Sequence, residues 1–304
     1  MHKLLLAALL FIPLGIFSQT YGNIAIKDGN IYYQTFGGGR DTLLIINGGP
    51  GMNSEGFAGL ATELGKDAFC LIYDQRGTGK SHIAEINNNT ITMDLMVEDI
   101  ESLRKSLGIS EWIVFGQSFG GMLGSYYATK HPENIKGLIL SASGGIDLEA
   151  FDDLDVLNKL SNEQRQQFNY WSRQISNGDT SFNAQLQRGK NLAPAYLYFD
   201  READVNAIGH RITQGNMTVN EIVHRNMRNI NFDCKPELRK FKKPVLILQG
   251  TEDIIPVEIA QRTHDIIPNS ELVLMDECAH YGWLEAREIY FEAIQSFFKK
   301  VDTP

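Results

Sequence analysis

The chain has 304 residues, enough for one large hydrophobic core or for a core with an inserted domain. Its 37 acidic and 28 basic residues give a formal net charge of −9, which argues against nucleic acid or an anionic membrane as a partner. Three cysteines are too few for a disulfide framework, and because the sequence has no metal-ligand spacing we expect no metal and no cofactor.

The N-terminal residues 1–18 have the pattern of a cleavable export signal. Lys3 precedes an apolar run over residues 4–17, and Ser18-Gln19 follows it. The run is shorter than the roughly 20 residues that a membrane-spanning helix needs, and its length and positive flank are typical of a signal peptide. We expect cleavage near Ser18-Gln19, export to the periplasm or the medium, and no stable membrane span. An anchor that is retained without cleavage is the alternative interpretation.

The first half of the chain alternates between short apolar strands and helices. The clearest helix covers residues 92–107, where Met96, Ile100 and Leu103 share one face, and Gly108 follows as a helix-ending signal. Such alternation predicts a mostly parallel sheet that carries helices on both faces. The expected strands are residues 31–36, 43–47, 69–73, 112–115 and 137–141.

The strand expected at residues 43–47 runs into Asn-Gly-Gly-Pro-Gly at residues 47–51. Three glycines and a proline build a tight turn in which no side chain obstructs the backbone amides. Unobstructed amides suit the stabilisation of a developing oxyanion, and we expect the N–H of Gly49 to be one donor. The crowding of this turn also leads us to expect a cis bond between Gly49 and Pro50. An ordinary glycine- and proline-rich loop is the alternative interpretation.

The strand expected at residues 112–115 ends in Gly-Gln-Ser-Phe-Gly-Gly at residues 116–121, and a helix-like run follows. A Gly-x-Ser-x-Gly sequence between a strand and a helix is the pattern of a nucleophile elbow. The serine of an elbow sits on a strained turn, where flanking glycines avoid the collisions that side chains would cause. We therefore expect Ser118 to be a catalytic nucleophile and the amide of Phe119 to be the second oxyanion donor. The alternative is an ordinary turn serine.

The pattern changes over residues 144–241, where long polar helical stretches replace the short apolar strands. The clearest of these stretches are residues 158–175 and 219–229. We predict a helical cap inserted between two parts of the core, residues 19–143 and 242–304. Two groups of aromatic residues in this cap either wall a substrate pocket or pack between helices: Phe168, Tyr170 and Trp171, and Tyr196, Tyr198 and Phe199.

Two further strands, expected at residues 243–250 and 271–275, are followed by Asp253 and His280. Catalytic groups collect at the carboxyl ends of strands in open α/β sheets, so we expect both side chains at the site of Ser118. In this arrangement His280 takes the proton from the serine, while Asp253 orients the imidazole and stabilises its charged form. The chain order serine, aspartate, histidine matches that of the α/β-hydrolases.

Other acids and histidines compete for these roles. Glu252 lies one residue closer to its strand than Asp253, whereas Asp276 lies too near His280 in sequence to come from a separate loop. None of the other six histidines follows an expected strand in the way that His280 does.

Three motifs together resemble those of the proline iminopeptidase family of α/β-hydrolases. They are Asn-Gly-Gly-Pro-Gly at residues 47–51, Tyr-Asp-Gln-Arg-Gly-Thr-Gly-Lys-Ser at residues 73–81 and Gly-Gln-Ser-Phe-Gly-Gly at residues 116–121. The family usually carries His-Gly-Gly-Pro-Gly, Asp-Gln-Arg-Gly-x-Gly-x-Ser and Gly-x-Ser-x-Gly-Gly in that order.

The resemblance spans residues 24–143 and 243–298, because the segments around Asp253 and His280 also fit the family pattern. It implies an α/β-hydrolase fold with a helical cap and a serine exopeptidase, which the expected export signal would make a secreted enzyme. Such an enzyme would release an N-terminal residue, with proline as the first candidate, from small peptides through an acyl-enzyme.

Two departures from the family pattern bear on the substrate. Asn47 stands where the family usually has histidine, which changes a side chain under the oxyanion loop but removes no backbone donor. The family also holds the free α-amine of its substrate with cap glutamates, whereas Asn231 stands where one of them would be. Four cap carboxylates are candidates to replace it, with solvated surface charges as the alternative interpretation: Asp200, Asp204 and, as the two we select, Glu202 and Glu221. Because no amine site is visible, a carboxylesterase or amidase acting on small molecules is the alternative function; the oligomeric state is left open.

Overall fold

The computed structural model describes residues 19–149 and 154–301 of the chain. The expected export signal at residues 1–18 lies outside this part. The described strands form a nine-stranded sheet in the order β1-β2-β4-β3-β6-β7-β8-β9, with β5 paired to β2. The strands are β1 (Thr20–Ile26), β2 (Gly29–Gly37), β3 (Thr42–Ile46), β4 (Phe69–Tyr73), β5 (His82–Ile83), β6 (Trp112–Gln117), β7 (Ile135–Ser141), β8 (Val245–Gly250) and β9 (Ser270–Met275).

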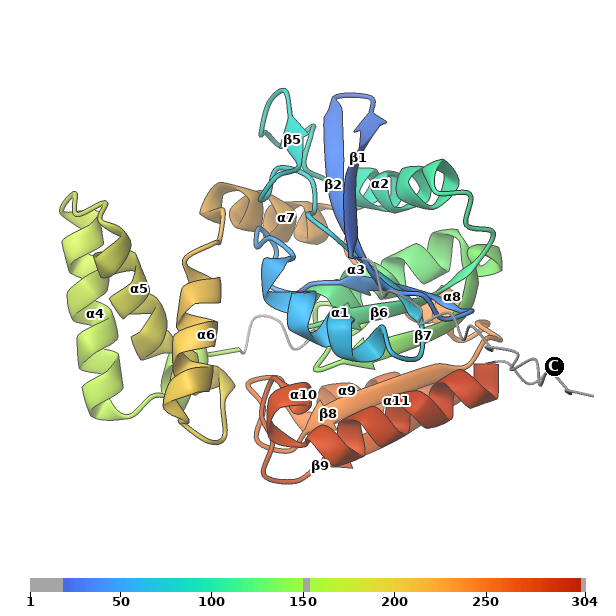
Figure 1. The fold of residues 1–304 in the computed structure, drawn as a ribbon. Coiled ribbons are helices and arrows are strands. Elements are labelled where there is room, and N and C mark those ends of the chain that lie inside the picture. Colours follow the sequence, from blue (N-terminus) through green and yellow to red (C-terminus); the bar gives the residue numbers. More distant parts are fainter. Residues whose placement is uncertain (1–18, 150–153, 302–304) are drawn as a thin grey trace, which may run out of the picture.

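The sheet is parallel from β4 to β9, while β2 runs antiparallel to β1, β4 and β5. Helices lie on both sides of it (Figure 1), which confirms the expected architecture. None of the described helices is long and apolar enough to cross a bilayer. The helices are η1 (Glu55–Phe57), α1 (Ala58–Leu64), α2 (Met93–Ser106), α3 (Phe119–Lys130), η2 (Pro132–Asn134), η3 (Val156–Lys159), α4 (Asn162–Ser176), α5 (Phe182–Leu192), η4 (Ala193–Tyr196), α6 (Glu202–Ile212), α7 (Met217–Asn229), α8 (Lys235–Leu238), α9 (Val257–Ile266), α10 (Gly282–Glu285) and α11 (Arg287–Val301).

The central strands are buried on both faces of the sheet, since alternate side chains of a strand point to opposite faces. In β3, Leu44 and Ile46 join an apolar cluster that includes side chains of α2, α3 and α8. Leu43 and Ile45 join a second cluster with side chains of α1 and α11. Burial on both faces explains why these strands read as continuous apolar runs in the sequence.

The expected strands and the expected helix at residues 92–107 are confirmed, whereas β1 and β5 were not predicted. Thr92 caps α2, because its hydroxyl oxygen accepts a hydrogen bond from the Leu95 amide. Gly108 follows that helix with a φ of +67°. β1 escaped prediction because four of its seven residues are exposed, Tyr21 with 76% of its surface, and β5 has only two residues.

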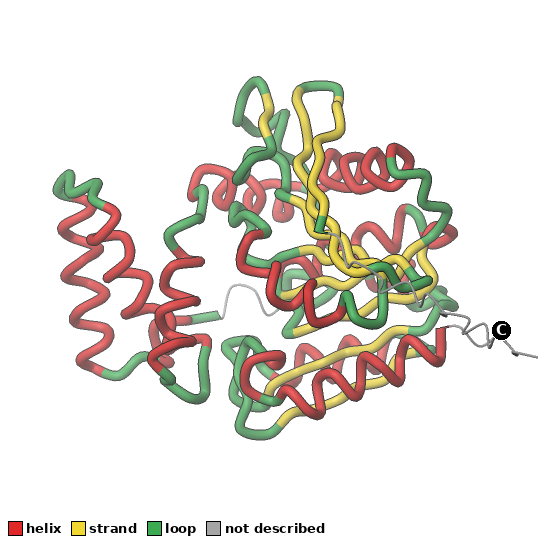
Figure 2. Tube along the Cα trace, viewed as in Figure 1, coloured by secondary structure: helices red, strands yellow, loops and turns green. Residues whose placement is uncertain are grey.

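The helices of the predicted cap, residues 144–241, divide into two groups. Helices α4, α5 and α6 lie together at one end of the molecule (Figure 1), and Figure 2 shows strands only in the body beside them. None of the residues of α4 is buried. Helices α7 and α8 instead pack against the core, where Val223, Met227 and Leu238 belong to the same apolar cluster as α2 and α3.

Candidate active site

Ser118 occupies a strained turn between β6 and α3. Its backbone angles are φ 57° and ψ −123°, a region that a residue with a side chain rarely adopts unless its surroundings enforce it. The Ser118 amide donates to the Ser141 carbonyl at 3.0 Å, and the Ser118 carbonyl accepts from the amides of Gly121 and Gly144. Three backbone hydrogen bonds therefore hold the turn in this conformation.

The glycines of the elbow are required by close backbone contacts. A Cβ on Gly116 would lie 2.2 Å from the Gly120 carbonyl oxygen, and a Cβ on Gly120 would lie 2.1 Å from the Ile46 carbonyl oxygen. Because neither glycine has a side chain, the turn can lie close to the end of β3. It therefore also lies close to the loop that follows β3.

We expect Gly120→Ala to destabilise the protein by about 1–3 kcal/mol, because the added methyl group must displace backbone rather than a flexible side chain. Urea unfolding of both proteins measures the difference. Gly59→Ala in α1 is the matched control, since a Cβ there meets nothing within 4 Å. That change should leave stability equal or higher by up to about 1 kcal/mol. Equal stability of Gly120→Ala and wild type would contradict the contact argument.

Asp253 and His280 come from the loops behind β8 and β9 and meet through a hydrogen bond. The imidazole Nδ1 donates to Oδ1 of Asp253 at 2.8 Å. The carboxylate also accepts from Gln249 Nε2 through Oδ2 at 3.0 Å and from the Ile255 amide at 3.3 Å. Both Asp253 and His280 are buried. With the proton on Nδ1, the Nε2 atom of His280 is left as an acceptor.

The competing groups behind these strands have different surroundings. Glu252 and Asp276 are both exposed, unlike Asp253.

Cys278 lies two residues before His280. Burial, together with the negative charges of Glu285 and Asp253, raises the pKa of the Cys278 thiol to about 12. A thiol that stays protonated at neutral pH is a poor nucleophile.

The loops that carry the three side chains are tied to one another. The Glu252 amide donates to the Cys278 carbonyl at 2.9 Å, which joins the acid loop to the histidine loop. Gln117, which precedes Ser118, donates from Nε2 to the His280 carbonyl at 3.4 Å. Glu285 accepts from the Ala279 amide at 2.8 Å and so braces the histidine loop from behind.

A cavity of about 290 Å³ connects most of the predicted residues. Ser118, His280, Gly49 and Phe119 all line it, and Asp253 lies behind His280. The rest of the lining is largely apolar. It includes Met52, Met122, Leu154, Val156, Ile212, Ile254 and Ile255 together with the polar residues Tyr196, Arg211, Asn220, His224 and Tyr281.

The glycine-rich loop packs directly against the elbow. A Cβ on Gly48 would lie 2.5 Å from Cβ of Ser118. Within the described residues, the amides of Gly49 and Phe119 donate to no protein group, so both are available to a substrate oxygen. The expected cis bond after Gly49 was wrong, since the described residues contain no cis peptide. Positive φ angles at Gly49 and Gly51, +63° and +93°, tighten the turn instead.

Asn47 and the second motif have structural partners. Asn47 Nδ2 donates to the Gly48 carbonyl at 3.2 Å and to the Met52 carbonyl at 3.0 Å, so it braces the loop from inside. In the second motif, Asp74 accepts from the amide and hydroxyl of Ser54. The side chains of this motif therefore hold the loop that follows β3.

The proposed amine-binding glutamates do not line the cavity. Glu202 and Glu221 are both exposed, and neither is among its lining residues. Among the described lining residues there is no carboxylate, whereas Arg211 contributes a cation. The polar groups of the described lining therefore do not include either of the two proposed cap glutamates.

Of the six cap aromatics, Tyr196 lines the cavity, whereas Tyr198 and Phe199 are exposed. Arg211 and Asn220 also line the cavity and were not predicted. Both lie in cap helices whose position over the core depends on packing between distant segments, and no local pattern marks them.

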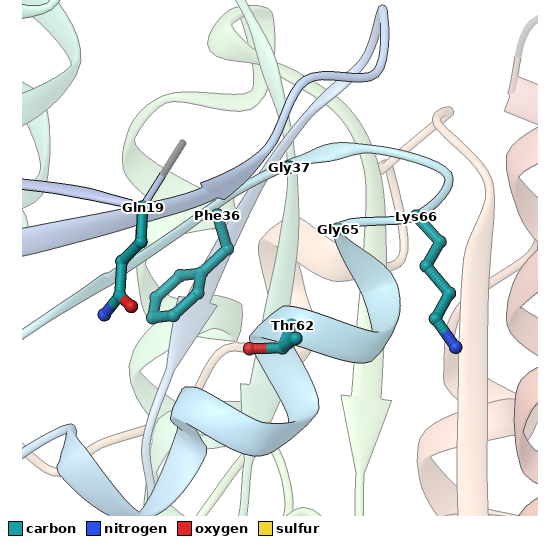
Figure 3. Close-up of a pocket in the computed structure, with 6 residues that line it drawn as sticks. All are labelled: Gln19, Phe36, Gly37, Thr62, Gly65 and Lys66. Atoms are coloured by element: carbon teal, nitrogen blue, oxygen red, sulfur yellow. The ribbon is translucent and has the colours of Figure 1, made fainter. Parts of the chain in front are cut away.

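A second cavity of about 380 Å³ lies between β2 and α1 (Figure 3). Its only charged lining residue in the described part of the chain, Lys66, forms an ion pair with Glu63 at 2.5 Å. None of the predicted site residues lines it, so the cavity at Ser118 is the candidate active site.

Comparison with known proteins agrees with the fold. The family model described as "alpha/beta hydrolase fold" matches residues 41–286. The proline iminopeptidase of Heyndrickxia coagulans is 26% identical over 292 residues, covering 93% of this chain and 99% of that protein.

Two solved structures have the same fold. The proline iminopeptidase of Mycobacterium smegmatis superimposes with a TM-score of 0.69 at 22% identity, covering 93% of this chain and 99% of that one. An esterase from Exiguobacterium antarcticum also reaches 0.69, at 19% identity and with 89% and 96% coverage. The fold is therefore shared by a peptidase and an esterase and does not by itself distinguish them.

Proposed function

Because the chain belongs to the α/β-hydrolase fold family, we propose that it is a serine hydrolase that works through an acyl-enzyme. The observation that carries this proposal is the shared cavity of Ser118 and His280, with Asp253 hydrogen-bonded to the far nitrogen of the imidazole. A histidine whose Nδ1 donates to a buried carboxylate is the base that activates the serine hydroxyl in serine hydrolases.

In the proposed mechanism, Ser118 Oγ attacks the substrate carbonyl and its proton passes to Nε2 of His280. The negative charge that develops on the carbonyl oxygen is stabilised by the amides of Gly49 and Phe119. The tetrahedral intermediate collapses when the leaving group takes the proton from His280. The acyl group is now an ester of Ser118. Water loses a proton to His280 and attacks this ester, and when the second tetrahedral intermediate collapses the imidazolium returns the proton to Ser118 Oγ and the acid is released.

We propose an aminopeptidase that releases N-terminal residues from small peptides as the specific activity. Its support is the likeness to the Heyndrickxia coagulans proline iminopeptidase over nearly the whole length of both chains. The motif series at residues 47–51, 73–81 and 116–121 supports the same substrate class.

A carboxylesterase or amidase acting on small molecules is the second candidate, and a specific observation favours it. An aminopeptidase must bind a cationic α-amine, yet the described lining of the cavity contains the Arg211 cation and no carboxylate. Ester and neutral amide substrates require no anionic site.

Hydrolysis of matched substrates separates the two activities. Proline and alanine p-nitroanilides with free amines should be cleaved by an aminopeptidase, and their N-acetylated forms should be refused because they lack the cation. Efficient cleavage of the acetylated anilides would rule out the aminopeptidase. Cleavage of a p-nitrophenyl ester without either anilide would assign the enzyme to the esterases.

We also propose that the protein is exported after cleavage near Ser18-Gln19. The support is the apolar run over residues 4–17 and the start of β1 at Thr20, so cleavage there leaves every described strand intact. N-terminal sequencing of the protein recovered outside the cytoplasm should begin near Gln19, and an intact Met1 would contradict export by cleavage.

A further inference from the structure

Arg211 reaches from the cap into the catalytic loops. It lies in the last turn of α6 and has only 7% of its surface exposed. Its Nη2 donates to the Gly48 carbonyl at 3.2 Å, and its Nη1 donates to the Tyr281 hydroxyl at 2.9 Å. The guanidinium carbon also lies 4.9 Å from the centre of the Phe57 ring, a cation–π distance. The side chain is thereby fixed at several points.

The Gly48 carbonyl belongs to the same peptide unit as the Gly49 amide. A trans peptide is planar, and its C=O and N–H point in opposite directions. A donor that fixes the direction of the Gly48 oxygen therefore also fixes the direction of the Gly49 N–H. That N–H is the proposed oxyanion donor.

Two donors converge on this oxygen from different parts of the chain. Asn47 Nδ2 approaches it from inside the loop at 3.2 Å, and Arg211 approaches from the cap. A glycine pair has little conformational preference of its own, so external hydrogen bonds decide how the peptide is oriented. Tyr281, the other partner of Arg211, follows His280 directly in sequence.

We propose that Arg211 is a positioning residue, which aims the Gly49 amide at the developing oxyanion and ties the cap to both catalytic loops. This inference rests on the proposed serine hydrolase function. In this role Arg211 acts through the Gly48–Gly49 peptide, since Nη2 donates to the Gly48 carbonyl and Nη1 donates to the Tyr281 hydroxyl.

Arg211→Met tests the proposal, because methionine keeps an apolar stem of similar shape and removes every donor. We expect kcat for p-nitrophenyl acetate to fall about 10- to 100-fold, as for a misdirected oxyanion donor, with KM changed less than about threefold. Affinity for phenylboronic acid, which forms a tetrahedral adduct with an active-site serine, should fall with kcat. Both quantities are measured per active site titrated with a fluorophosphonate, so unfolded protein does not contribute.

Arg201→Met is the matched control. Arg201 stands at the N-cap position of α6 and also donates to a carbonyl of the core, that of Leu284, at 2.9 Å, but it does not contact the glycine-rich loop. The kcat and the boronate affinity of Arg201→Met should stay within twofold of wild type. Arg211→Lys keeps the charge but offers one nitrogen where the guanidinium uses two, so it should fall between wild type and Arg211→Met.

The outcomes separate the two proposals. Wild-type kcat and boronate affinity in Arg211→Met would overturn the positioning role while leaving the serine hydrolase intact. A wild type that neither hydrolyses the ester nor reacts with fluorophosphonate would overturn the proposed function. The NMR amide resonance of Gly49 tests the positioning without any substrate. It should shift in Arg211→Met and not in Arg201→Met, and an unchanged resonance would contradict the proposal.

Discussion

Ser118→Ala is expected to lower kcat by at least about 10⁴-fold, because the nucleophile, the base and its orienting acid act as a unit and loss of one disables the others. KM should change little, since the hydroxyl contributes to the reaction rather than to binding. Steady-state kinetics with the ester or the free-amine anilide measures the loss. A fluorophosphonate should label Ser118 in the wild type and leave the variant unlabelled.

Ser125→Ala is the matched control for this change. Ser125 lies on the same helix, α3, and is fully buried. Its hydroxyl has no hydrogen-bond partner within the described residues, so its removal should leave kcat within twofold and should not lower stability. A loss of less than about tenfold in Ser118→Ala, or labelling of another serine, would remove Ser118 from the mechanism.

The sequence was most informative where function depends on consecutive residues. The elbow around Ser118 is recognisable because its geometry needs glycines at fixed positions, and the contacts of Gly116 and Gly120 give the reason. Asp253 and His280 could be placed because each follows a buried strand, and parallel strands deliver such loops to one edge of the sheet. The core strands themselves are marked by burial on both faces.

The cap was less predictable, because its position over the core depends on contacts between segments far apart in sequence. Arg211 reaches Gly48 across 163 residues, and Asn220 reaches the Pro50 carbonyl across 170. No local pattern distinguishes Arg211 from a surface arginine such as Arg201. The same limitation explains why the sequence could not place Glu202 and Glu221. Their charge is visible in the sequence, but not that both lie on the exposed sides of their helices.

Both the core and the cap contribute residues to the site. The core supplies the serine, the acid, the histidine and the Gly49 amide from the loops behind its strands, and the Phe119 amide from the first residue of α3. The cap supplies Tyr196 and Arg211, and Glu285 accepts from the amides of Tyr198 and Phe199, which fastens the cap to the histidine loop. Differences in the cap can therefore change both what is bound and how firmly the catalytic loops are held.

Asp253→Asn should lower kcat about 10³- to 10⁴-fold, as the same change does in another enzyme with a serine, histidine and aspartate. Both orientations of the new amide are unfavourable. With its nitrogen toward His280, Nδ1 must accept, so Nε2 carries the proton and cannot take one from Ser118. With its nitrogen toward Gln249, two donors face each other, and Gln249 cannot rotate without losing its bonds to the carbonyls of Gly250 and Ile255.

Glu252→Gln is the control for this variant, because Glu252 is the neighbouring acid but its side chain is exposed. Its kcat should stay within twofold of wild type. The ¹⁵N shifts of the His280 ring provide the decisive second readout. In wild type they should report the tautomer with the proton on Nδ1, and in Asp253→Asn a larger population with the proton on Nε2. A fall in kcat with an unchanged tautomer would mean that Asp253 acts through the charge of its carboxylate rather than by orienting the imidazole. An unchanged kcat would remove Asp253 from the triad altogether.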